Sequence, residues 1–175
     1  WSKTLDYVSS FNVAGSAPRL VGGENDLAQN PDNLRAEHGL SLFDAKHRFV
    51  FSGTYEIPAR VAKAVLGGWQ VNMIAGFSSG TPFTVYDSAN VALQGSSPEI
   101  TGFYSSRPNA VSDPNAGRHT ADQWMSRSAF QRLDPVTQAG QFGSAGRNTV
   151  RGPGIANVDV SLLKSMALRE SLRLE

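Results

Sequence analysis

The chain has 175 residues, a formal net charge of +1 and no cysteine. This charge gives no electrostatic basis for binding nucleic acid, and the lack of cysteine excludes a disulfide framework and thiol chemistry. Charged residues make up 18% of the chain and hydrophobic residues 40%, both low for a packed globule, while 17 glycines and 9 prolines indicate many turns.

The N-terminal part is predicted to contain the end of a strand followed by a long loop. Residues 1–6 are expected to be the strand. Residues 7–45 are rich in Gly, Pro, Asn and Ser, and we expect a loop there with one turn of helix near Asn33–His38. A loop of this length is unusual in a compact domain and usually indicates function or disorder.

Residues 46–57 and 68–86 show the clearest strand pattern in the chain. Apolar and polar residues alternate with a period of two, which is typical of a strand with one apolar and one polar face. The gap between the two stretches is short and Gly67-Gly68 permits a reversal, so we expect an antiparallel hairpin. Pro82 has no amide proton for a ladder and predicts a bend. The apolar side of the hairpin contains Phe49, Phe51, Tyr55, Ile57, Trp69, Val71, Met73 and Phe77.

The C-terminal part is predicted to be a second long loop followed by two strands. Residues 87–154 have little strand pattern, with a short helix expected at Asp122–Phe130. Apolar residues alternate again at 156–168, which predicts a third full strand, and a tight turn leads into the start of another at 171–175. The chain starts without Met inside a predicted strand and stops inside another, so we expect it to be a piece of a larger protein.

Alternation alone does not decide what covers the apolar face. A second sheet covers it in a soluble β-sandwich, whereas lipid covers it in an outer-membrane barrel, whose polar face lines a wet lumen. The predicted strands have the roughly 9–11 residues that a membrane-spanning strand needs. Aromatic residues near their ends, Trp69 among them, are typical of a membrane interface.

The connections also alternate between long and short along the chain, as they do in outer-membrane barrels. We therefore predict an all-β fold: a curved antiparallel sheet of about four full strands plus a partial one, from a transmembrane β-barrel with two long extracellular loops. The alternative is a soluble β-sandwich module that binds carbohydrate or a surface.

No catalytic, cofactor or metal site is predicted. The spacing of His38, Asp44 and His47 matches no metal-ligand motif, and no nucleophile elbow accompanies the Ser, His and Asp residues. The glycine-rich run at 142–154 lacks the residue order of a phosphate-binding loop.

Polar residues on the predicted strands are expected to face the lumen, with cross-strand hydrogen bonding as their structural role. These lumen-facing candidates are Arg48, Thr54, Glu56, Gln70, Asn72, Asp159 and Ser161. In the loops, Trp124, Arg147 and Arg151 are the candidates for ligand contact. Loop packing is the alternative for Trp124, and binding to neighbouring carbonyls or carboxylates is the alternative for the two arginines.

Four segments carry a resemblance to a known family. They are NLRAEHGLSLFDAKHRFVFSGTYEIP, LGGWQVNMIAGFSSGTPFTV, SRPN with a following W…SAF segment, and FGSAGRNTVRGPGIANVDVSLLK. In this order they resemble the C-terminal barrel of TonB-dependent receptors, in the Oar-like group that has an N-terminal carboxypeptidase-regulatory-like domain.

The resemblance implies a non-enzymatic segment of an outer-membrane barrel, commonly of about 22 strands, that takes part in the uptake of a bulky solute. It implies no cofactor. The implied partners are outer-membrane lipid, a plug domain and the remaining barrel strands of the parent chain, and the TonB complex through that parent chain. It does not identify the solute.

Overall fold

The computed structural model describes most of the chain, and within that part the secondary structure consists of β-strands and two short 3-10 helices. The described residues are 1–8, 28–58, 67–87, 89, 91–93, 106–169 and 172–174. They divide into two compact units. The strand unit comprises His47–Ser79 and Gly154–Glu175, and the loop unit comprises Trp1–Lys46 and Gly80–Pro153. None of the helices in these residues has the length and hydropathy to span a membrane.

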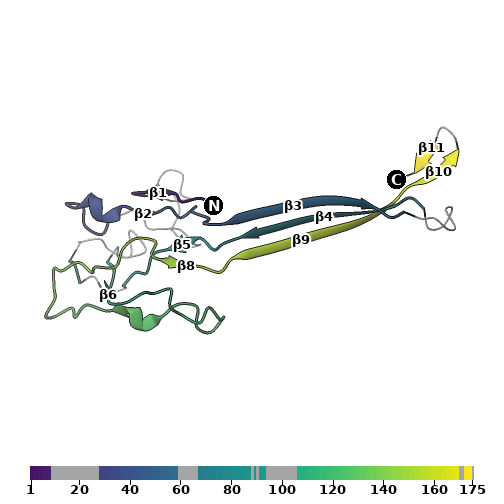
Figure 1. Ribbon diagram of the computed structural model, residues 1–175. Helices are drawn as coiled ribbons and strands as arrows, with labels where there is room; N and C mark the ends of the chain where they lie inside the picture. The colour runs from purple at the N-terminus through teal and green to yellow at the C-terminus, as the bar shows by residue number, and fades with distance from the viewer. Residues whose placement is uncertain are drawn as a thin grey trace. The chain divides into compact units, whose positions relative to one another are not determined.

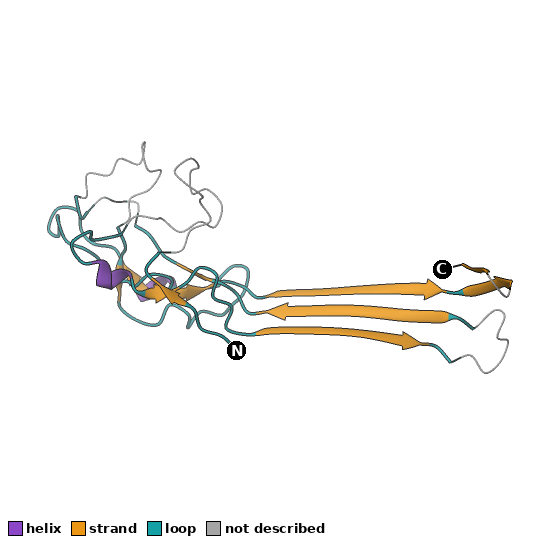
Figure 2. Ribbon diagram, turned by 90° about the horizontal axis from the view of Figure 1, so that it is seen from above, coloured by secondary structure: helices purple, strands orange, loops and turns teal. Residues whose placement is uncertain are grey.

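The strand unit is built on one antiparallel sheet of three long strands in the order β3-β4-β9 (Figure 1). These strands are β3 (Arg48–Glu56), β4 (Trp69–Ser78) and β9 (Ile155–Lys164). Seen from above, they lie side by side in a single layer (Figure 2). The all-β antiparallel fold predicted from the alternation is therefore confirmed.

The register of the sheet places most apolar residues of the three strands on one face, with Val50, Ile74 and Leu163 on the other. Phe51 lies opposite Ala75, which in turn lies opposite Val158. One position along, the pairing residues are Ser52, Ile74 and Asp159. Directly opposed residues share a face, and a slip by one residue would exchange the faces. The sheet therefore has one mainly apolar and one mainly polar face.

The short connection between β3 and β4 depends on a glycine in the left-handed region. Gly68 has a φ of +78°, and a Cβ there would overlap the carbonyl of Ser165. The Ser165 N–H donates to the Gly68 carbonyl at 2.8 Å. Glycine adopts this φ without the steric cost that a side chain would add, as the predicted reversal at Gly67-Gly68 requires.

Two predicted strand boundaries are wrong. The strand predicted at 68–86 ends at Ser78, and the chain then passes so close to Gly152 that a Cβ at Gly80 would overlap its carbonyl. Residues 82–83 belong instead to a separate two-stranded sheet, formed by β5 (Pro82–Phe83) and β8 (Val150–Arg151).

The strand predicted at 156–168 is interrupted at Ser165. β9 ends at Lys164, where its partner β4 begins, and the chain continues as β10 (Met166–Arg169). β10 pairs with β11 (Leu172–Leu174), which lies within the predicted final strand at 171–175.

The loop unit contains short paired segments where the sequence predicts only loop at 7–45 and 87–154. β1 (Leu5–Asp6) pairs with β2 (Gly39–Leu40), and β6 (Asn109–Ala110) pairs with β7 (Phe130–Gln131). The strand predicted at 1–6 is thus only two residues long.

Helices are also short in the loop unit. η1 (Leu34–Glu37) lies within the predicted turn of helix, while the helix predicted at 122–130 is limited to η2 (Arg127–Ala129). Alternation cannot reveal these segments because their strands are only two residues long. Side-chain contacts, described below, join them. Residues 9–27 and 94–105 of the two predicted loops lie outside the described residues.

Candidate functional site

Among the described residues, the apolar face of the strand unit is largely exposed. Phe49, Tyr55 and Val160 are 60%, 63% and 64% exposed. Ala75 is the only buried residue of this unit within the part of the chain that the structure describes. A continuous apolar face of this kind is unusual on a soluble monomer, where large exposed apolar patches mark contact with a partner or a membrane.

Aromatic side chains lie toward both ends of this apolar face. At the end where β3 starts, the rings of Phe49 and Phe77 are opposed across the two strands with centroids 6.3 Å apart. At the other end, Lys164 lies opposite Trp69 with its Nζ 4.9 Å from the ring centroid. The cation–π contact explains how a lysine is accommodated at an otherwise apolar position.

The polar face carries hydrogen bonds that run across the strands. Thr54 Oγ1 donates to Asn72 Oδ1 at 2.9 Å, and Gln70 Nε2 donates to the same oxygen at 2.7 Å. Asn72 Nδ2 in turn donates to Ser161 Oγ at 3.5 Å. The structure therefore brings these lumen-facing candidates together in one cross-strand network.

The remaining lumen-facing candidates share this face without joining that network. By register, Arg48 lies opposite Ser78, Glu56 opposite Gln70, and Asp159 opposite Ile74. Asp159 accepts a hydrogen bond of 2.7 Å from Asn157, which the sequence analysis did not single out. That this face lines a lumen remains a prediction.

The interior of the loop unit contains charged and amide side chains beside its apolar ones. Glu37 and Arg107 form an ion pair whose side chains are only 6% and 3% exposed. Gln29 is joined to both: its N–H donates to Glu37 Oε1 at 3.0 Å, and its Oε1 accepts from the Arg107 N–H at 2.8 Å. Gln29 Nε2 also donates to the Gly143 carbonyl at 2.8 Å. This network joins three segments that are far apart in the sequence.

Arg147 extends the same network toward the N-terminus. Its side chain is almost fully buried, pairs with Asp6, and donates from Nε to the Glu37 carbonyl at 2.7 Å. A ligand would reach Arg147 only by displacing these partners. Arg147 thus occupies the structural role that the sequence analysis gives as the alternative to ligand contact.

Arg151 holds a fully buried carboxylate. It donates to Asp44 and to the Gly80 carbonyl, while the Thr4 N–H donates to Asp44 at 2.7 Å. Burial alone raises the pKa of Asp44, but the hydrogen bonds from Arg151 and Thr4 and the positive charge of Arg151 outweigh it and lower that pKa. Asp44 therefore stays ionised and joins the N-terminal segment to β8.

Trp124 borders a pocket in the loop unit. Its Nε1 donates to the Arg151 carbonyl at 2.6 Å, and His119 contacts its ring edge-on with centroids 5.2 Å apart. The pocket has a volume of about 680 Å³ and is lined by residues 122–128.

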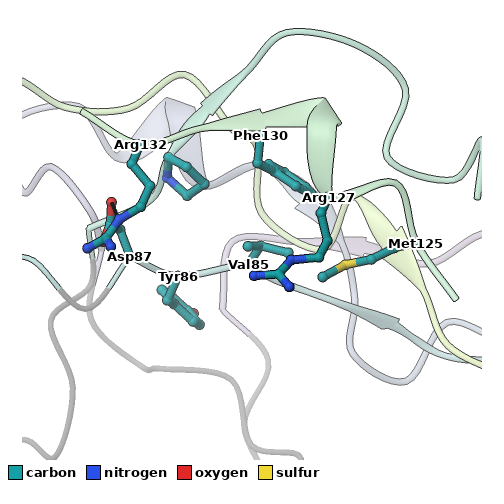
Figure 3. Close-up of a pocket in the computed structure, with 8 residues that line it drawn as sticks. Val85, Tyr86, Asp87, Met125, Arg127, Phe130 and Arg132 are labelled. Atoms are coloured by element: carbon teal, nitrogen blue, oxygen red, sulfur yellow. Dashed lines mark hydrogen bonds and ion pairs between the residues drawn. The ribbon is translucent and has the colours of Figure 1, made fainter. Parts of the chain in front are cut away.

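A second pocket, of about 480 Å³, lies in the loop unit and shares Met125 and Arg127 with the first. Figure 3 shows Arg127 and Met125 on one side of it and Asp87 with Arg132 on the other. Sequence reasoning missed these residues, because no pattern of spacing links Asp87 to a segment some forty positions away.

No metal centre occurs within the described ranges. Three His, Asp or Glu side chains come together nowhere in them closely enough to hold an ion. Of the residues considered from the sequence, His38 packs instead against the Tyr7 ring, with centroids 5.0 Å apart.

The strand unit has the architecture of a transmembrane β-barrel wall: one antiparallel layer, strands about ten residues long, and apolar and polar residues on opposite faces. The chain belongs to the family described as outer membrane beta barrel domain, which matches residues 1–175. It is therefore an outer-membrane barrel segment, located in the outer membrane, and the alternative of a soluble β-sandwich is wrong. No curated protein and no solved structure matches the chain.

Proposed function

We propose that this chain is a wall-and-loop segment of a TonB-dependent receptor, non-enzymatic, that takes part in the uptake of a bulky solute. The apolar face of the strand unit contacts lipid, and the polar face lines the lumen. The loop unit lies outside the cell and contributes to solute capture. The observation that carries the proposal is the single-layer sheet whose aligned apolar face has no protein cover among the described residues.

Strand length supports the membrane position. About ten residues at about 3.3 Å each span about 33 Å, and a tilt near 45° reduces this to about 23 Å across the bilayer. The apolar band of outer-membrane barrels is about 25 Å tall. The aromatic pair Phe49–Phe77 and the ring of Trp69 then fall toward its two borders.

The connections support the orientation. By register, Arg48, Ser78 and Ile155 mark the same end of the sheet, and every connection to the loop unit leaves from that end. Barrels of this class have short periplasmic turns and longer extracellular loops. The end with Glu56 and Gln70 therefore faces the periplasm.

The two edges of the sheet are evidence for further strands in the parent protein. In the described part of the chain, β3 and β9 each pair along their length only with β4, so each has an edge without a partner strand. Exposed edges of this length promote aggregation, and closing the barrel removes them. The remaining strands, the plug and the contact with TonB are supplied by the parent chain in this proposal.

The resemblance of the four sequence segments to TonB-dependent receptors supports the energised mode of uptake. A nutrient panel tests it in three strains: one with the intact gene, one without it, and one with the gene but without TonB. Loss of uptake of the same compound in the second and third strains is expected. Uptake that needs the gene but persists without TonB would show a passive pore and contradict the proposal.

A further inference from the structure

The pocket of about 480 Å³ in the loop unit has the size of a small-molecule site, since such sites have volumes of roughly 300–1,000 Å³. Three segments line it. Val85 to Asp87 follow β5, Pro108 precedes β6, and Met125 to Arg132 include η2 and β7. All of them belong to the loop unit, so the pocket lies within one compact body.

The carboxylate of Asp87 in the pocket is already paired with an arginine. Asp87 is buried and accepts hydrogen bonds from Arg132 Nη2 at 2.8 Å and from the Ala89 N–H at 3.1 Å. Burial alone raises the pKa of Asp87, but these contacts outweigh it and lower that pKa. Asp87 is therefore ionised and paired, and it repels an incoming anion only weakly.

The positive charges of the pocket remain accessible. The Arg132 side chain is 69% exposed although it is paired with Asp87. Arg127 is exposed, and in the described part of the chain its guanidinium takes part in no ion pair or hydrogen bond. With one carboxylate against two guanidinium groups, the lining carries a net positive charge. Arginine binds carboxylates and phosphates through two parallel hydrogen bonds.

The rest of the lining is apolar or aromatic. Val85 and Phe130 lie between the two charged sides, and Met125 lies beside Arg127 (Figure 3). Methionine and aromatic walls favour flat or flexible apolar groups. A ligand that satisfies both parts has an anionic head for Arg127 and an apolar body for Val85, Met125 and Phe130.

We propose that this pocket binds an anionic group of the bulky solute together with the apolar part of the solute next to it, and that Arg127 holds the anionic group. The inference rests on the proposed function, because it names the chemical class that the loop unit captures. Asp87 and Arg132 form the opposite side as an ion pair that adds no net charge, so the net positive charge of the lining is that of Arg127.

Calorimetric titration of the full-length protein in detergent tests the pocket. The probes are phenylacetate, the uncharged phenylacetamide as its matched control, and phenyl phosphate as the second anionic head. Saturable binding of an anionic probe is expected, with phenylacetamide at least about tenfold weaker. Failure of both anions to bind, or equal binding of phenylacetamide, would overturn the proposal.

Matched variants separate the pocket from general charge. Arg127→Gln is expected to weaken anion binding about tenfold while leaving the weak binding of phenylacetamide unchanged. Arg118→Gln removes an exposed arginine that does not line the pocket and is expected to leave both affinities unchanged. Equal effects of the two substitutions would contradict a site at Arg127.

A substitution at Met125 tests the apolar part of the pocket lining. Met125→Ala is expected to weaken binding of phenylacetate and phenylacetamide by the same factor, and an unchanged phenylacetate affinity would contradict the wall. Binding to purified protein requires neither TonB nor an energised membrane. Absent binding together with TonB-dependent uptake would therefore overturn the pocket alone, while anion binding in a protein whose uptake ignores TonB would overturn the proposed function alone.

Discussion

In the strand unit large hydrophobic side chains lie at the surface, whereas in the loop unit charged and amide side chains lie in the interior. Phe49 and Val160 are more than half exposed, while Glu37, Asp44 and Arg107 are buried. The inversion follows from the surroundings. A sheet against lipid gains by presenting apolar groups outward, and a loop unit with little regular structure must satisfy its backbone and side chains with hydrogen bonds.

The two units are also stabilised by different kinds of interaction. The sheet is stabilised by backbone pairing along β3, β4 and β9. Its apolar face needs an apolar environment. The loop unit depends on a few ion pairs that join distant segments. Changes on the sheet surface should therefore affect membrane assembly, and changes in the buried pairs should affect the loop unit alone.

The largest effect is expected from breaking the Glu37–Arg107 pair. Arg107→Met leaves the Glu37 carboxylate buried without its cation, which typically costs about 3–5 kcal/mol. Hydrogen exchange of the full-length protein in detergent should show lost protection in the loop unit and unchanged protection in β4. Arg118→Met, at an exposed position, is the control and should change neither. Unchanged protection of the loop unit in Arg107→Met would show that the pair does not hold it.

A second substitution tests the sheet. Phe51→Arg puts a charge on the apolar face near the middle of β3, where such a charge costs about 2–4 kcal/mol in a lipid-facing position. Ser52→Arg, its neighbour on the opposite face, is the matched control. We expect the yield of assembled protein in the outer membrane to fall for Phe51→Arg and to change little for Ser52→Arg. Equal yields would contradict a lipid-facing side.

The pH dependence of the loop unit should depend on Asp44. Because the pKa of Asp44 is lowered from its ordinary 3.8, the carboxylate stabilises the folded unit above about pH 3.8 and loses this contribution as the pH falls toward its folded-state pKa. Asp44→Asn should cost about 1.5–3 kcal/mol near pH 7, the range for hydrogen bonds to charged groups.

Limited proteolysis of the loop unit between pH 7 and pH 3 measures this effect. The difference between the parent protein and Asp44→Asn should be constant down to about pH 4 and should shrink below it. A difference that is still constant at pH 3 would mean that Asp44 does not supply the pH dependence in this range.

The smallest effect is expected on the polar face. Thr54→Val removes the hydrogen bond to Asn72, whose Oδ1 still accepts from Gln70. The cost should be about 0.5–1.5 kcal/mol. It is measured as a shift in the urea midpoint for folding into lipid vesicles. A loss larger than that of Phe51→Arg in the same assay would reverse the predicted importance of the two faces.

The two units also differ in how far the sequence predicts them. Alternation in β3, β4 and β9 depends on neighbours two residues apart, so Phe51, Met73 and Val160 could be assigned to one face before the register was known. Alternation does not specify where a strand stops. β4 ends at Ser78, just before Gly80 comes close to Gly152, which is distant in the sequence.

The interior of the loop unit follows no local period. Glu37 and Arg107 are separated by 70 positions, and Arg127 lines the same pocket as Val85 although the two residues are also distant in the sequence. Both Glu37 and Arg107 occur in segments that carry the family resemblance, the second within SRPN, but a resemblance assigns no contact. The sequence left two roles open for Arg147 and Arg151, a structural role and ligand contact. The burial of Arg147 favours its structural role.

A cysteine scan along β3 tests most directly which side of the sheet faces lipid. Each residue from 48 to 56 is replaced by cysteine in a cysteine-free version of the full-length protein, labelled with a fluorophore and reconstituted with lipids that carry a nitroxide quencher. Quenching should alternate, strong at Phe49, Phe51 and Tyr55 and weak at Ser52 and Thr54. Uniform quenching, or strong quenching at Ser52 and Thr54 instead, would contradict the account.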